Sequence, residues 1–309
     1  MLHYRSLSGL TLDNVWMTIG SFDGVHLGHQ EIVRRVVSGA TQAGVPSVVF
    51  TFYPHPAVVL GKRQDPLLLT PPDVKADLLG KMGVDYVVTY PFTVETSMHT
   101  AEEFIDLLHG HLGMQRLLVG EDFALGRGRE GDVIRLEELG RKFGYKLEVV
   151  TPVRNGDVIV SSSQIRKRLF EGDVAQAARL LGRRYMISGE VVHGDARGKL
   201  IGIPTANMDV PIEQAIPKTG VYVCQAYVGG NSFGAVANIG YRPTFDNGTA
   251  APKVEAHLLD FDGDLYGSVL SLEYIERLRD EMRFISVQSL IEQIQADISS
   301  ARNILDTPE

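Results

Sequence analysis

The chain is poor in cysteine, since Cys224 is the single one among its 309 residues. A lone cysteine excludes an intrachain disulfide framework and a zinc site built from several thiolates. Long apolar runs are also lacking: no stretch approaches the roughly 20 residues that span a bilayer. The N-terminus has no charged segment followed by an apolar one, as a secretory signal would have. We therefore expect a cytoplasmic protein that has no membrane partner.

Net positive charge is lacking as well. Acidic side chains number 38 and Lys plus Arg 30, which gives a net charge of −8, so bulk attraction to nucleic acid is not indicated. Any phosphate group must be held by a local site. The hydrophobic share of 44% and the charged share of 22% are ordinary for a globular protein. The length suffices for two domains, and nothing indicates an obligate protein partner.

The first 182 residues alternate short apolar runs with helical patterns. "VWMTIG" and "VPSVVFTF" predict buried strands, and the stretch between them predicts a helix from about Leu27 to a stop at Gly44. The same alternation continues through "AEEFIDLLHGHL", "QRLLVG", "RLEELGRKFG" and "YKLEVV". It predicts an α/β domain with a parallel sheet covered by helices on both faces. Ligands of such sheets bind at the carboxyl ends of the strands, where "TIGSFDGVHLGH" and "TFYPHP" lie.

The pattern changes from about Met186. β-rich runs such as "ISGEVVHG", "GVYVCQAYVGG" and "SVLSLEYIERL" are separated by Gly, Asn and Pro, which predicts an antiparallel barrel or sandwich. One C-terminal helix is expected on an apolar stripe of period 3.6, made of Val287, Leu290, Ile291, Ile294, Ile298 and Ala301. The junction falls in "LLGRRYMIS", and we divide the chain into residues 1–182 and 183–309.

The segment "SFDGVHLGHQEI" places His26 and His29 just after a predicted strand and at the start of a predicted helix. A metal site would need more ligands than Asp23 supplies, and histidines in a glycine-rich turn are unusual packing residues. An anion site is the favoured interpretation, because glycines let backbone approach a ligand and permit positive φ. The helix N-terminus adds free N–H groups. The segment matches neither the P-loop nor the dinucleotide-binding fingerprint.

These motifs together resemble a known family. "GSFDGVHLGH", "TFYPHP", "VGEDFALGRGREGD" and "SSSQIRKRL" are similar to the adenylyltransferase half of the bacterial bifunctional riboflavin kinase/FMN adenylyltransferases. "GKLIGIPTAN", "ANIGYRPTF", "VEAHLLDFDGDLYG" and "LRDEMRF" resemble the kinase half. The resemblance implies a Rossmann-like nucleotidyltransferase domain that turns FMN and ATP into FAD and pyrophosphate. It also implies a β-barrel domain that turns riboflavin and ATP into FMN and ADP with Mg²⁺.

For the first domain, the resemblance implies that His26, His29 and Arg166 are catalytic. FMN offers an already ionised phosphate oxygen, so the site has to hold two anions together and stabilise charge rather than supply a base. The serines of "SSSQIRKRL" could also be simple helix caps. The residues implied to bind ATP are Gly20, Phe22, Asp23, Gly24, His26, Gly28, His29, Ser162, Ser163 and Arg166. Those implied to bind flavin are Pro54, His55, Pro56 and Asp122.

For the second domain, the hydroxyl of Thr205 and the amide oxygen of Asn207 are hard oxygen ligands suited to Mg²⁺. Glu255 is the candidate to accept the ribityl hydroxyl proton, although it could be an outward polar residue of an alternating strand. The residues implied to bind ATP are Gly194, Arg197, Gly198, Lys199, Gly202, Pro204, Thr205 and Asn207. Those implied to bind flavin are Asn238, Arg242, Arg279, Glu281 and Phe284.

Two other functions fit parts of the pattern. One is a different nucleotidyltransferase of the same His-x-Gly-His type, fused to a flavin-binding regulatory module. The other is a flavin-binding protein that kept the fold and lost turnover. The charged and polar transfer residues present in both halves favour an enzyme over the second of these.

Overall fold

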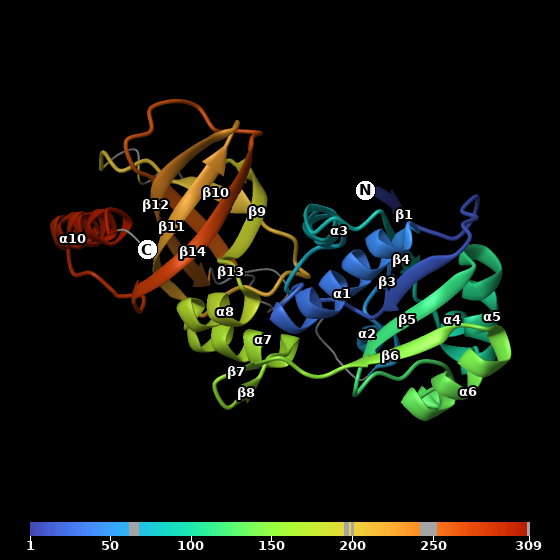
Figure 1. Ribbon diagram of the computed structural model, residues 1–309. Helices are drawn as coiled ribbons and strands as arrows, with labels where there is room; N and C mark the ends of the chain where they lie inside the picture. Colours follow the sequence, from blue (N-terminus) through green and yellow to red (C-terminus); the bar gives the residue numbers. More distant parts are fainter. Residues whose placement is uncertain (62–67, 195–197, 199–200, 242–251, 308–309) are drawn as a thin grey trace. The chain divides into compact units, whose positions relative to one another are not determined.

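The structure is a computed structural model that describes residues 1–61, 68–194, 198, 201–241 and 252–307. The chain folds into two compact units, Met1–Ser162 and Ser163–Glu309. Figure 1 shows the α/β unit and the barrel unit, which are described separately below. Within the described residues, no helix combines the length and apolarity needed to cross a bilayer.

The first unit contains a six-stranded parallel sheet in the order β1-β4-β3-β2-β5-β6. Its strands are β1 (Leu2–Tyr4), β2 (Val15–Ile19), β3 (Ser47–Tyr53), β4 (Tyr86–Pro91), β5 (Met114–Gly120) and β6 (Lys146–Val150). Its helices are α1 (Leu27–Ala43), α2 (Pro56–Val59), α3 (Pro72–Lys81), α4 (Val94–Met98), α5 (Ala101–Leu112), the 3₁₀ turn η1 (Arg127–Arg129) and α6 (Val133–Phe143). A short hairpin of β7 (Arg154–Asn155) and β8 (Val158–Ile159) follows.

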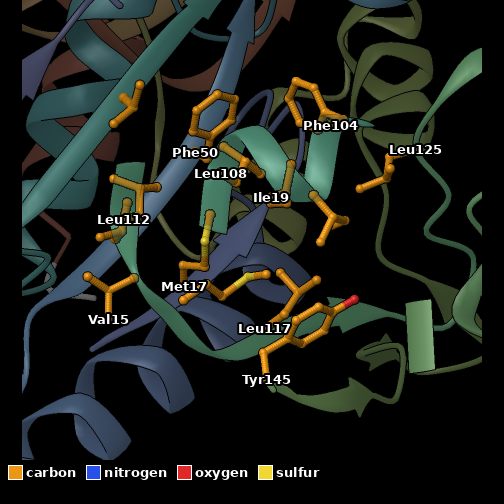
Figure 2. Packing of buried hydrophobic residues seen from close by; sticks show 14 of the residues in the cluster. Val15, Met17, Ile19, Phe50, Phe104, Leu108, Leu112, Leu117, Leu125 and Tyr145 are labelled. Atoms are coloured by element: carbon orange, nitrogen blue, oxygen red, sulfur yellow. The ribbon is translucent and has the colours of Figure 1, made fainter. Parts of the chain in front are cut away.

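Both faces of this sheet are covered, as the sequence predicts. On one face α1 and α3 pack against β3 and β4 through Val33, Leu79, Val49 and Val87. On the other face α5 and α6 complete the largest core cluster, in which Figure 2 shows Met17 and Ile19 of β2 near Leu108 of α5. Strand order reverses between β2 and β5, so the carboxyl end of β2 is the switch point at which open α/β sheets bind ligands.

The second unit is built on a closed antiparallel barrel in the order β10-β13-β12-β11-β14-β9. Its strands are β9 (Tyr185–Val192), β10 (Ala206–Asp209), β11 (Gly220–Val228), β12 (Asn231–Tyr241), β13 (Pro252–Leu258) and β14 (Val269–Arg279). Its helices are α7 (Ser162–Glu171), α8 (Val174–Leu181) and α10 (Val287–Leu305). The sequence predicts the barrel and its last helix, but not β10, which is short and begins within the "PTAN" motif.

The apolar stripe of α10 has two functions. Its C-terminal half packs on the outside of the barrel, where Ile298 and Ala301 contact a cluster that includes Val221 and Val236. Its N-terminal half, with Leu290 and Ile294, lines a cavity instead. The regular 3.6 period therefore marks one face that serves both packing and a pocket.

Helix α8 belongs to the barrel unit, because it packs against β9 and β14 and is preceded by the boundary at Ser162. Its buried face consists of Val174, Ala177, Leu180 and Leu181. The sequence division after residue 182 would leave this helix out of the barrel domain.

We therefore predict that a fragment beginning at Ser163 is more stable than one beginning at Arg183. Burying one valine or leucine side chain stabilises by about 1.5–3 kcal/mol, so losing α8 should lower both the free energy of unfolding and Tm. Urea unfolding of the two fragments would measure the difference. Equal midpoints and slopes would show that α8 adds nothing to the barrel.

Candidate active sites

The turn after β2 leads directly into α1 and carries both histidines. His26 caps the helix: its Nδ1 accepts a hydrogen bond from the backbone N–H of His29 at 3.4 Å. The two imidazole rings stack with centroids 3.6 Å apart and planes 18° apart. They lie at the N-terminus of a 17-residue helix, where the free N–H groups and the helix dipole favour an anion.

His29 has a buried, unsatisfied nitrogen. Its Nδ1 has no hydrogen-bond partner within the described part of the chain, and the edge of Phe22 packs on its ring at 5.0 Å. Burial, followed by the charges of His26 and Lys75, holds the pKa of His29 well below its ordinary value. At neutral pH the ring is therefore uncharged and keeps one N–H donor and one acceptor.

The backbone of the turn differs from the expectation for its glycines. Gly24 has a positive φ of 86°, but the other positive φ angles of the turn belong to Phe22 (46°) and Val25 (41°). Gly20 and Gly28 are needed for space instead: a Cβ on Gly20 would lie 3.1 Å from the Phe22 ring, and one on Gly28 would lie 3.3 Å from the His26 ring. Two non-glycine residues in the left-handed region mark a turn held by its surroundings.

Asp23 is buried and holds the turn to the rest of the unit. Its Oδ1 accepts hydrogen bonds from the backbone N–H groups of Leu69 at 2.9 Å and Thr70 at 3.2 Å. The hydroxyl of Ser162 donates to the Asp23 carbonyl oxygen at 2.8 Å. Two residues expected to bind ATP thus make bonds that shape the turn.

Like Ser162, the other two residues of the "SSSQIRKRL" motif that are expected to bind ATP, Ser163 and Arg166, lie on α7. Ser163 begins the second compact unit. Arg166 is only 6% exposed, which is unusual for a guanidinium group unless it is paired.

A cavity of about 380 Å³ lies among the carboxyl-end loops of the first unit, within the range of small-molecule sites. Its wall includes Gly20, His55, Pro56 and Asp122, so three of the four predicted flavin residues and one predicted ATP residue meet there, whereas Pro54 does not. His55 caps α2, since its Nδ1 accepts from the N–H of Ala57 at 3.1 Å.

Sequence reasoning missed the aromatic wall of this cavity. Phe52, Phe92 and Phe104 all line it, and the rings of Phe52 and Phe92 meet edge to face at 5.4 Å. The sequence could have indicated two of these rings as ligand contacts, because Phe52 lies near the carboxyl end of β3 and Phe92 directly follows β4.

In the barrel unit, three polar residues form one row across three neighbouring strands. Asn207 of β10 pairs with Glu255 of β13, which pairs in turn with Asn238 of β12. Directly paired residues of an antiparallel sheet point to the same face. On β13 the alternate residues Val254 and Ala256 are buried, so the row lies on the outer face of the barrel.

Asn207 fits a cation ligand. It is 8% exposed, and its Oδ1 is buried with no hydrogen-bond partner among the described residues. Such an orphaned acceptor costs about 1–3 kcal/mol, which a bound cation would offset. A Cβ on Gly194 would lie 2.1 Å from the Asn207 amide, so only glycine permits this close approach.

Glu255 lines a cavity of about 670 Å³ between the barrel's outer face and α10. Asn238, Arg279, Glu281 and Phe284 line it too, as do Gly198 and Thr205, so half of the predicted kinase residues meet around one space. Lys253, which sequence reasoning missed, forms an ion pair with Glu255 at 2.6 Å.

Arg279 is held by the protein itself. Its Nη2 and Nε donate to Asp297 of α10 at 2.7 and 3.0 Å, and Asp297 is 5% exposed. This pair fixes the start of the loop that carries Glu281 and Phe284.

A second cavity of the barrel unit, of about 450 Å³, is lined by Pro204, Thr205 and the loop from Phe261 to Tyr266. Thr205 therefore lies on both barrel cavities. Gly202 has a positive φ of 78°, as a tight turn before "PTAN" requires. Arg197, Lys199 and Arg242 lie outside the described residues.

The whole chain was then compared with known proteins. The profile of the FAD synthetase family matches residues 10–164, and that of riboflavin kinase matches residues 181–305. A Pseudomonas fluorescens protein named bifunctional riboflavin kinase/FMN adenylyltransferase is 40% identical over 286 residues, which cover 92% of this chain and 91% of that protein. A Bacillus subtilis protein of the same name is 37% identical over 288 residues, which cover 92% and 90%.

A solved structure from Streptococcus pneumoniae, titled a macrolide-efflux protein, matches with a TM-score of 0.89 at 29% identity over 98% of each chain. What the two proteins share is the fold.

Fold and sites together define a transferase that joins a nucleotidyltransferase-type α/β unit to a β-barrel kinase unit. The chain belongs to the bifunctional riboflavin kinase/FMN adenylyltransferase family, which confirms the resemblance seen in its motifs. A family that uses ATP in this way implies a divalent metal cation.

We predict that the His29 imidazole is still neutral at pH values where an ordinary histidine is half protonated. Because its pKa is lowered in the folded state, the unfolded chain binds more protons below the ordinary value of 6.5. Folding stability should therefore fall as pH drops through that value. ¹⁵N NMR of the ring nitrogens, with His29→Gln to assign the signals, would measure the titration. A midpoint at or above 6.5 would contradict the buried, neutral ring.

Proposed function

We propose that this chain makes FAD from riboflavin in two ATP-dependent steps, each at its own site. The barrel unit forms FMN and the α/β unit adenylylates it. The observation that carries this proposal is that each unit has its own cavity. The cavity of the α/β unit is lined by Gly20 and Ser21, from which the turn to His26 and His29 continues, and the larger cavity of the barrel unit is lined by Thr205 and Glu255.

In the adenylylation step, a phosphate oxygen of FMN attacks the α-phosphorus of ATP, and the bond to pyrophosphate breaks. The attacking oxygen is already ionised, so no base is needed. His26, His29 and the N–H groups at the start of α1 stabilise charge on the α-phosphate and the departing pyrophosphate. A neutral His29 can fill this role, because one of its ring nitrogens still carries an N–H group that donates a hydrogen bond.

The aromatic cavity of the α/β unit suits the flavin ring. Phe52, Phe92 and Phe104 supply flat apolar surface, while Gly20 on the same wall is the first residue after β2. The ring would thus lie at the end of the sheet from which residues 20–29 start, the segment that carries His26 and His29 and that we call the histidine turn.

In the kinase step, the ribityl hydroxyl oxygen attacks the γ-phosphorus of ATP, ADP leaves, and Glu255 accepts the hydroxyl proton. Asn207 and Thr205 would hold Mg²⁺, which neutralises phosphate charge when it is bound. The ion pair with Lys253 orients the Glu255 carboxylate. The larger barrel cavity would take the flavin, with Asn238, Glu281 and Phe284 on its wall. The cavity lined by Pro204 and Thr205 would take ATP.

The direct test supplies riboflavin, Mg²⁺ and ATP and separates the products by chromatography. We expect FMN first and FAD later, with pyrophosphate released only in the second step. A protein that binds flavin and forms neither product would be a binding module. One that adenylylates another phosphate acceptor, such as phosphopantetheine, and not FMN would be a different nucleotidyltransferase.

We predict that His29→Ala blocks FAD formation and leaves FMN formation almost unchanged. Losing one preorganised donor lowers the rate by about 10²–10³-fold, so FMN should accumulate during turnover of riboflavin. His111, which lies on α5 and bonds the Leu10 carbonyl through Nδ1, supplies the matched control His111→Ala. An equal loss of both activities in His29→Ala would give the residue a structural role.

Glu255→Gln and Asn207→Asp should fail in different ways. Glu255→Gln keeps the shape of the side chain but not its basicity, so the kinase kcat should fall by roughly 10²–10⁴ with ATP affinity little changed. Asn207→Asp keeps an oxygen ligand, so it should retain some activity with an altered Mg²⁺ requirement. Added FMN should become FAD in both variants. A near-normal kinase kcat in Glu255→Gln would remove this residue from the catalytic set.

A further inference from the structure

A lysine is buried directly beneath the histidine turn. Lys75 lies on α3 and is 5% exposed, although lysine is almost never fully buried unless it has partners. Its Nζ donates to the carbonyl oxygen of Ser21 at 2.9 Å and to Oγ1 of Thr51 at 2.8 Å. The Thr51 hydroxyl donates in turn to the same Ser21 oxygen at 3.0 Å.

This triangle joins three elements at one backbone oxygen. Ser21 is the second residue after β2, Thr51 lies on β3 and Lys75 on α3. The Ser21 carbonyl oxygen thus accepts two hydrogen bonds, one from Lys75 and one from Thr51. Two residues further on, Asp23 is held by Leu69 and Thr70, which immediately precede α3.

The positive charge of Lys75 interacts electrostatically with titratable groups of the turn. Burial lowers the pKa of Lys75 to about 8, opposed by the nearby carboxylate of Asp23. The ammonium in turn helps to lower the pKa of His29, and more weakly that of His3. Within the described residues, the titratable groups that interact electrostatically with Lys75 are Asp23 and His29 on the turn and His3 on β1.

We propose that Lys75 is a positioning residue for adenylyl transfer: it fixes the backbone that carries His26 and His29 and keeps a buried positive charge beside the phosphate site. Taking an ammonium group out of water costs several kcal/mol, and a methionine would fill the volume without that cost. A lysine retained at this costly position therefore indicates that its positive charge helps the site to bind anions. The inference rests on the proposed function of the histidine turn.

The first experiment compares Lys75→Met with Lys81→Met, a control at the exposed end of the same helix. We expect kcat/KM for FAD formation to fall about 10–100-fold in Lys75→Met, since small misplacements at a site have effects of this size. FMN formation by the barrel unit of the same molecules shows that the protein is correctly assayed, and urea unfolding of both variants shows whether the α/β unit is folded. Unchanged kcat/KM in Lys75→Met would overturn the inference.

Thr51→Val gives a second test that introduces no change of charge. The substitution keeps the shape and removes the hydroxyl that links Lys75 to Ser21. A smaller loss of FAD formation, in kcat rather than in KM, is expected if the triangle positions the turn. Wild-type kinetics in Thr51→Val would show that the triangle of hydrogen bonds does not position the turn.

The pH profile separates positioning by a charged lysine from simple packing. In the wild type, kcat/KM for FAD formation should decline above about pH 8, as free Lys75 loses its proton. Bound phosphates favour the ammonium, so the decline of kcat should start at a higher pH. The residual activity of Lys75→Met should lack this alkaline decline. The same decline in wild type and Lys75→Met would assign it to another group and contradict the inference.

His29→Ala, assayed alongside, distinguishes two kinds of failure. If His29→Ala loses FAD formation and Lys75→Met does not, only the inference about Lys75 fails. If His29→Ala retains it, the histidine turn is not the transfer site, and the proposed function of that turn fails as well.

Discussion

The turn between β2 and α1 is largely buried, and its backbone polar groups therefore need hydrogen-bond partners. Two sets of hydrogen bonds provide these partners. Lys75 and Thr51 bond the Ser21 carbonyl, while the Asp23 carboxylate bonds two backbone N–H groups ahead of α3. With the backbone held in this way, Phe22 and Val25 adopt left-handed conformations, and His26 and His29 stack at the helix N-terminus.

The barrel unit has a different arrangement. Its row of polar residues lies on the outside of a closed barrel, where β10, β13 and β12 place Asn207, Glu255 and Asn238 side by side. The outer face becomes a cavity only because α10 covers it, and the buried pair of Arg279 and Asp297 fixes that helix to the end of β14. Each unit thus has a buried charged side chain, Lys75 or Asp297, whose hydrogen bonds join separate elements of the fold.

Much of this arrangement could be predicted from the sequence. Strands β2 and β3 and helix α1 follow from hydrophobic periodicity, and the motifs identify the segments that carry His26, His29, Asn207 and Glu255. The supporting charges could not be predicted, because nothing local distinguishes buried Lys75 from exposed Lys81 on the same helix. Only the tertiary fold brings Ser21 and Thr51 to it. Arg279 illustrates the same limit, since its motif suggests a flavin contact and its partner Asp297 is 18 residues away.

If the two sites act independently, two variants that each lack one site should complement each other when they are mixed. His29→Ala alone, supplied with riboflavin and Mg-ATP, should stop at FMN, and Glu255→Gln alone should leave most riboflavin unchanged. We expect an equimolar mixture to form FAD, because FMN made by the first variant is adenylylated by the second. A mixture that forms no FAD, while each variant keeps its remaining activity, would show that the two sites do not act independently.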